Sequence, residues 1–162
     1  MPRFLLAMLM VMISSAAAQV QRGATSATAD GKATAIRATA LDYIEGWYAG
    51  DAARMERALH PDLAKRMVRP ASQNDAGYDP AKGASVFNHM GAMALVQGTR
   101  DGYGKSTSSA PRQKDVPILD VFGNAASVKI VAANWIDYLH LAKFNGRWVI
   151  VNVLWELKPI AP

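Results

Sequence analysis

Apolar and polar residues alternate along the last third of the chain, and this pattern predicts three consecutive antiparallel strands between Ala125 and Leu157. The strongest local signal is Asn145-Gly146, because these two residue types suit the positive-φ positions of a type I′ turn and apolar runs flank them. We therefore expect a β-hairpin there. A further strand over Val116–Phe122 is expected to precede these three and to join them in one sheet.

The chain before this sheet has apolar residues at helical spacing. Three helices are predicted, over residues 34–50, 52–59 and 89–99. Asp51 is a suitable cap for the second helix, because its side chain can accept a hydrogen bond from the first turn. His60-Pro61 is expected to end that helix, since a residue before proline is disfavoured in the α region.

Short strands at 63–68 and 84–88 and two loops, 69–83 and 100–114, complete the predicted order of elements. Helices on the N-terminal side of the chain, followed by an antiparallel sheet, define an α+β fold. Both faces of the last strand are largely apolar. We therefore expect helices to cover one face and a subunit partner to cover the other, which gives a homodimer through the sheet.

The first 18 residues have the composition of a secretory signal peptide. Arg3 precedes an apolar run, Phe4 to Ile13, and a small-residue cleavage site follows at Ala16–Ala18. The run is shorter than the roughly 20 residues that a membrane span needs. We expect export to a bacterial periplasm, no membrane contact after cleavage, a flexible linker over 19–33 and a single domain over 34–158.

Composition argues against several functional classes. The chain has 18 basic and 13 acidic residues, a formal net charge of +5, and no cysteine. The basic residues form no run and no aromatic residues are interleaved with them, so nucleic-acid binding is not expected. The three histidines lack the spacing of metal ligands, and no nucleotide-binding or cofactor fingerprint is present. No metal or cofactor is therefore predicted.

Several motifs indicate a family. Gly46–Asp51, His60-Pro61, Asn88–Met90 and Asp137–Leu141 are the most specific of them. With these motifs the chain resembles the putative lumazine-binding-like family of the nuclear transport factor 2-like superfamily, over roughly Thr34 to Leu157. The resemblance implies a cone in which three N-terminal-side helices pack on a curved, mainly antiparallel sheet and enclose a pocket.

Within the same superfamily, the ketosteroid isomerase branch has a tyrosine on its first helix and an aspartate base further along the chain. Tyr43 matches the tyrosine, whereas the position of the base falls on Met67. No acidic residue lies within three positions of Met67. Proton abstraction by that route therefore lacks its base.

Asp137 and His140 are the two residues of the predicted sheet that could carry acid or base chemistry. Strict alternation places them on opposite faces of one strand, so only one of them can face a pocket unless a bulge near Trp135 resets the alternation. A buried Asp137 would be an acid with a raised pKa. His140 would either titrate against a ligand or be a core histidine that bonds a carbonyl.

The pattern of aromatic residues and the absence of an assembled acid, base or nucleophile lead to one expectation. The protein binds a small apolar or aromatic molecule in its cone and is not a catalyst; the ligand-binding candidates are Tyr43, Trp47, His89, Met93, Tyr138, His140 and Trp155. Two alternatives stay open. One is an isomerase, dehydratase or cyclase that uses Asp137 or His140 with Tyr43, and the other is a homodimeric interaction module without a ligand.

Overall fold

The computed structural model describes residues 29–76, 78–79, 81, 83, 85–106 and 112–159. The chain divides into two units, Met1–Ala35 and Ile36–Pro162, and the second contains the sheet. The predicted signal peptide, 1–18, lies outside the described residues, and so does the predicted linker as far as residue 28. Residues 29–33, which we assigned to the linker, are helical.

The helices in the described part of the chain come before most of the sheet. The first helix covers residues 29–49 and ends at Gly50, whose φ of 68° is the left-handed conformation that glycine adopts without a steric cost. α2 (Ala52–Ala58) follows, and the carboxylate of Asp51 caps it by accepting from the Arg54 backbone N–H. α3 (Ala92–Arg100) and the 3-10 helix η2 (Tyr103–Ser106) come later in the chain.

Seven strands form one sheet: β1 (Leu59–Pro70), β2 (Ser85–Met90), β3 (Lys114–Asp115), β4 (Ile118–Phe122), β5 (Ala125–Ala132), β6 (Trp135–Phe144) and β7 (Arg147–Leu157). Their order is β2-β1-β7-β6-β5-β3, with β4 also paired to β5. β1 and β7 run parallel, and the other pairs among the described strands are antiparallel. The predicted hairpin is confirmed, with φ values of 49° at Asn145 and 82° at Gly146.

Three element boundaries differ from the sequence prediction. β1 begins at Leu59, directly after α2, so His60-Pro61 lies within a strand, because the extended conformation that proline favours for the preceding residue suits a strand as well. The third helix begins at Ala92 because His89 and Met90 still pair with β1. The strand predicted over 116–122 begins only at Ile118, after Pro117, which has no N–H to donate, and the short β3 precedes it.

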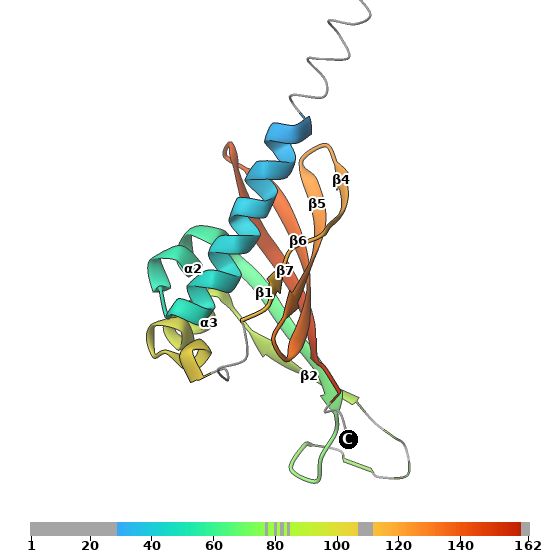
Figure 1. Ribbon diagram of the computed structural model, residues 1–162. Coiled ribbons are helices and arrows are strands. Elements are labelled where there is room, and N and C mark those ends of the chain that lie inside the picture. Colours follow the sequence, from blue (N-terminus) through green and yellow to red (C-terminus); the bar gives the residue numbers. More distant parts are fainter. Residues whose placement is uncertain are drawn as a thin grey trace, which may run out of the picture. The chain divides into compact units, whose positions relative to one another are not determined.

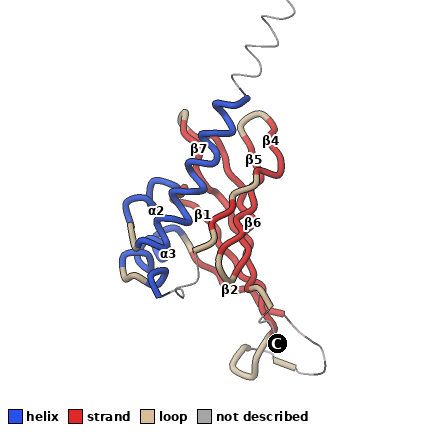
Figure 2. The backbone as a smooth tube through the Cα atoms, viewed as in Figure 1, coloured by secondary structure: helices blue, strands red, loops and turns tan. Residues whose placement is uncertain are grey.

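The helices cover one face of the curved sheet, as Figures 1 and 2 show. Within the second unit, Ile36, Ala40 and Ile44 of the first helix are buried in one core with the inward residues of β5, β6 and β7. No helix of the described part of the chain covers the opposite face (Figure 2). These findings confirm the α+β fold and its curved, mainly antiparallel sheet.

The face of β6 that the helices cover is the face of Asp137. Trp135, Asp137, Leu139 and Leu141 are buried, whereas Tyr138 and His140 are exposed. A bulge does occur, but in β7: His140 pairs with Asn152 and Leu141 with Ile150, so Val151 has no partner on β6. The alternation of β6 therefore continues unbroken, and Asp137 and His140 stay on opposite faces.

None of the helices in the described ranges is both long enough and apolar enough to cross a membrane.

Candidate ligand cavity

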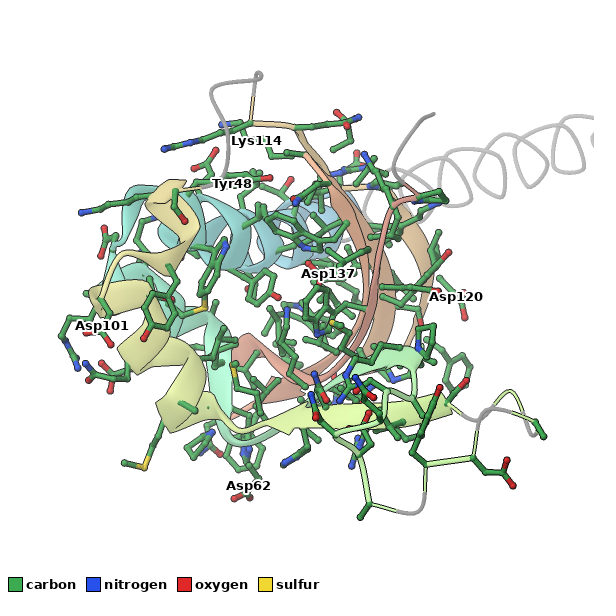
Figure 3. The ribbon with its side chains drawn as sticks, turned by 90° about the horizontal axis from the view of Figure 1, so that it is seen from below. Tyr48, Asp62, Asp101, Lys114, Asp120 and Asp137 are labelled. Atoms are coloured by element: carbon green, nitrogen blue, oxygen red, sulfur yellow. The ribbon has the colours of Figure 1, made fainter. Side chains whose placement is uncertain are left out.

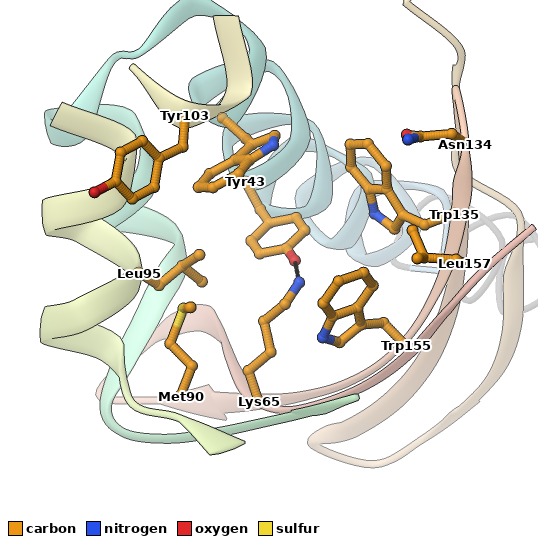
Figure 4. Close-up of a pocket in the computed structure, with 10 residues that line it drawn as sticks. Tyr43, Lys65, Met90, Leu95, Tyr103, Asn134, Trp135, Trp155 and Leu157 are labelled. Carbon is orange, nitrogen blue, oxygen red and sulfur yellow. Dashed lines mark hydrogen bonds between the residues drawn. The ribbon is translucent and has the colours of Figure 1, made fainter. Parts of the chain in front are cut away.

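A cavity of about 310 Å³ lies between the helices and the inner face of the sheet. Half of the residues around it are aromatic, and Lys65 is the one lining residue with a charged side chain. The lining consists of Tyr43, Trp47, Lys65, Met90, Leu95, Tyr103, Asn134, Trp135, Trp155 and Leu157 (Figure 4).

Regular secondary structure positions most of these side chains. Tyr43 and Trp47 lie one turn apart on the first helix and so share one of its faces. Trp155 and Leu157 are two residues apart on β7, which directs both to the inner face of the sheet. The walls of the cavity therefore follow from helical and strand periodicity rather than from loop conformations.

η2 brings Tyr103 to the cavity. The segment packs so closely on the first helix that a Cβ atom added at Gly104 would lie 2.1 Å from the backbone oxygen of Trp47. Only glycine allows the two backbones to approach this far. Gly104 therefore fixes the distance between Tyr103 and the aromatic residues of the first helix.

A buried polar cluster lies at the side of the cavity where β1 meets the first helix. The Lys65 ammonium donates to the Tyr43 hydroxyl at 2.5 Å and to the Asp137 Oδ1 atom at 3.1 Å. Tyr43 in turn donates to the same Oδ1 atom at 3.4 Å. In Figure 4 the side chains of Lys65 and Tyr43 come from opposite walls and meet at their polar ends.

Asp137 is 0% exposed and is not among the residues that line the cavity. Its Oδ2 atom accepts from the Trp135 indole N–H at 2.7 Å, and its Oδ1 atom accepts from Lys65 and Tyr43. Figure 3 shows it on the inner side of the sheet, whereas Asp120 lies on the other side. Asp137 is thus the buried counter-ion of Lys65, with both oxygen atoms already bonded.

Charge and burial keep the Tyr43 phenol protonated. Burial raises the pKa of Tyr43 well above its usual value of 10.0, and the nearby Asp137 carboxylate raises this pKa further. The Lys65 ammonium also lies 4.9 Å from the ring centroid of Trp155 and 5.2 Å from that of Tyr43, within the range of cation–π attraction. The cluster therefore presents a protonated phenol and an ammonium group to an aromatic cavity.

Three of the seven ligand-binding candidates lie together in the cavity: Tyr43, Trp47 and Trp155. The structure does not bring the other four to it. His89 is exposed on β2, beside Arg66 of β1, and Tyr138 and His140 lie on the uncovered face of β6. Met93 is 87% exposed on α3, where it borders a separate surface groove. Periodicity alone does not say which face of an element is covered, and the structure places these four outside the cavity lining.

Sequence reasoning missed Lys65 as a site residue. One available signal was its position between Leu63 and Met67 on a single strand face, because a lysine among apolar residues is unusual. The opposite face of β1 has the apolar residues Ala64 and Val68, so apolar character alone did not show which face is buried. Six more lining residues were also missed, and their elements reach the cavity only through tertiary packing: Met90, Leu95, Tyr103, Asn134, Trp135 and Leu157.

Within the described residues, no three side chains of the histidine, cysteine, aspartate or glutamate type lie close enough to hold a metal ion.

The ion pair predicts a strong energetic coupling between Lys65 and Asp137. We expect Lys65→Met and Asp137→Asn each to lower the free energy of unfolding by about 3–5 kcal/mol, because each leaves one buried charge without its partner. The double variant should lose at least about 1 kcal/mol less than the sum of the two. Urea unfolding of the four proteins measures this coupling.

The exposed pair Lys114–Glu45 serves as the control, since the Lys114 side chain is 52% exposed. The same cycle with Lys114→Met and Glu45→Gln should give a coupling below about 1 kcal/mol. Equal couplings at the two pairs would show that the Lys65–Asp137 interaction has no special weight in the fold.

The model of the family described as "Putative lumazine-binding" matches residues 31–156. The chain is also similar to crystal structures of NTF2-like proteins. One, from Methylobacillus flagellatus, has 18% identity and a TM-score of 0.57, with 80% of this chain and 94% of that chain covered. One from Shewanella baltica has 20% identity and a TM-score of 0.55, with 80% and 96% covered. Both are described as proteins of unknown function.

A third structure, from Novosphingobium aromaticivorans, is described as NTF2-like with a cystatin-like fold; it has 13% identity, a TM-score of 0.57 and coverage of 83% and 86%. At these identities the similarity shows the fold alone. No curated protein matches the chain. The family match extends over most of the chain, and the structural matches agree with the cone that the sequence predicted. The chain therefore belongs to the Putative lumazine-binding family and has the NTF2-like fold.

Proposed function

We propose that this protein binds a small apolar or aromatic molecule in the cavity and does not transform it. The observation that carries this proposal is the lining itself, in which aromatic side chains surround a single ammonium group. Small-molecule sites are typically concave and mostly apolar, with few polar groups that set the ligand's orientation. The family description, which refers to lumazine binding, also supports a small-molecule ligand.

The volume limits the size of the ligand. Pockets that bind drug-sized molecules range from roughly 300 to 1,000 Å³. A cavity of about 310 Å³ is at the lower end of this range. We therefore expect a molecule with about two fused rings.

The geometry favours binding over the isomerase, dehydratase or cyclase alternative. Asp137 does not line the cavity, and its oxygen atoms accept from Lys65, Tyr43 and Trp135. His140 lies on the opposite face of the sheet and is exposed. A general base must come within hydrogen-bond reach of the proton that it removes. Neither candidate meets that condition for a ligand in the cavity.

A binding test can localise the ligand. 2-Acetylnaphthalene, which has two fused aromatic rings, serves as the probe. Met90→Trp should reduce the affinity for it at least tenfold, because the larger side chain would occupy part of the cavity. Met93→Trp places the same side chain on the exposed side of α3 and should leave the affinity unchanged. Isothermal titration calorimetry measures both. Equal affinities in the two variants, or no binding by the wild-type protein, would contradict the proposal.

We also propose that the protein is exported, on the basis of its first 18 residues. When the full chain is expressed in a Gram-negative host, the periplasmic fraction should contain a protein that begins at Gln19. Intact mass spectrometry of that fraction identifies the first residue. A full-length chain that remains in the cytoplasm would contradict export.

Homodimerisation is a second candidate function, and the uncovered face of the sheet favours it. Phe87 of β2, Leu154 of β7 and Tyr138 of β6 are exposed large apolar side chains on this face. Tyr138 pairs with Leu154, and Leu154 pairs with Arg66 of β1. Val68, two residues further along β1, pairs with Phe87 of β2. The three apolar side chains thus lie on one face of the sheet, with Arg66 of β1 beside Leu154, and a second copy of the chain offers the same surface.

Sedimentation velocity tests this candidate. The wild-type protein should be a dimer at micromolar concentration, and Leu154→Glu should make it monomeric because a carboxylate would be buried in the interface. Phe122→Glu, at a more exposed position on β4, should remain dimeric. A wild-type monomer at micromolar concentration would exclude this interface.

A further inference from the structure

The Lys65 ammonium has one N–H donor left for a ligand. A lysine ammonium carries three donors, and here two of them bond to the Tyr43 hydroxyl and the Asp137 carboxylate. Across the part of the chain that the structure describes, no third acceptor is within hydrogen-bond distance of the Nζ atom. Since Lys65 is 8% exposed and lines the cavity, the space beside this donor is the cavity itself.

The charges around the cavity disfavour an anionic ligand. Asp137 compensates the Lys65 charge at 3.1 Å, so the cluster has no net charge to attract an anion. Tyr43 stays protonated and adds none. The remaining lining side chains are uncharged and mostly apolar. A carboxylate or sulfonate would lose its hydration there and find only a cation that is already paired.

A neutral oxygen acceptor avoids the free-energy cost of burying a charge that has no free partner. A carbonyl oxygen accepts a hydrogen bond without bringing a charge into the cavity. A hydrogen bond from a charged donor is stronger than one from a neutral donor. A ligand without an acceptor would cover the Lys65 N–H and leave it unbonded, and binding sites discriminate strongly against such ligands.

We propose that the ligand is a flat, uncharged aromatic molecule with a carbonyl oxygen that accepts a hydrogen bond from Lys65. The proposal deepens the proposed function and rests on it, because it names the chemical class that the cavity selects. The aromatic part would lie among Tyr43, Trp135 and Trp155, whose rings border the same space. The carbonyl oxygen would meet the ammonium at the buried polar cluster.

Three naphthalenes of similar shape separate the contributions. 2-Acetylnaphthalene carries the carbonyl, 2-isopropenylnaphthalene replaces the oxygen with a CH₂ group, and 2-naphthoate carries a full negative charge at pH 8. The wild-type protein should bind the ketone about tenfold or more tightly than the alkene. It should bind the naphthoate more weakly than the ketone. Calorimetric titration at pH 8 gives the three affinities.

Lys65→Met should remove the preference for the ketone, so that the ketone and the alkene bind equally. Because this variant leaves Asp137 unpaired and can fail to fold, the Lys65→Met/Asp137→Asn variant repeats the comparison without a buried charge. The wild-type affinity ratio is a test that needs no variant. Lys114→Met, which changes a lysine outside the cavity, should retain the wild-type preference.

The possible results of these titrations distinguish failure of the proposed function from failure of the Lys65 proposal. If none of the naphthalenes binds, the proposed function fails. If the ketone and the alkene bind the wild-type protein equally, the cavity is a ligand site but Lys65 selects no acceptor, and this inference is overturned. Tightest binding of the naphthoate would overturn the requirement for a neutral ligand. A tenfold preference that survives in both Lys65 variants would assign the selection to another residue.

Discussion

Lys65 and Asp137 place opposite charges 3.1 Å apart in an interior that is otherwise mostly apolar. Burial of a charge is unfavourable unless it has a partner and hydrogen bonds, and both conditions are met here through Tyr43 and Trp135. The four side chains come from the first helix, β1 and β6, so the cluster joins the helical layer to two separate parts of the sheet. The same cluster sets the polar end of the cavity, and the ligand chemistry thus depends on an interaction that also orders the fold.

The cluster can form only because of the strand register. The hairpin at Asn145-Gly146 fixes the pairing of β6 with β7. The bulge at Val151 of β7 lies between the Leu141–Ile150 pair and the His140–Asn152 pair. Asp137 therefore faces the helices together with Trp135 and Leu139. A shift of one residue would move the carboxylate to the uncovered face and bring His140 inward. The Asn145-Gly146 turn, which is the strongest local signal in the sequence, thus helps to determine that Asp137 and not His140 lies in the interior.

The sequence is sufficient to predict the fold, because its information is local and redundant. Asn145-Gly146, the alternation of β5 to β7 and the helical spacing around Tyr43 each indicate the same α+β arrangement. The site is harder to predict, because Tyr43, Lys65 and Asp137 interact over 22 to 94 positions in the chain. Tyr43, Trp47 and Trp155 could be selected as large aromatic residues. Lys65 could not, since whether a strand residue faces inward depends on which face the helices cover.

A crystal structure of the protein with 2-acetylnaphthalene would test the central claim most directly. We expect the naphthalene ring among Tyr43, Trp135 and Trp155 and the carbonyl oxygen within hydrogen-bond distance of the Lys65 Nζ atom, with the Lys65–Asp137 bond intact. A ring bound elsewhere, or a carbonyl oxygen directed away from Lys65, would contradict it.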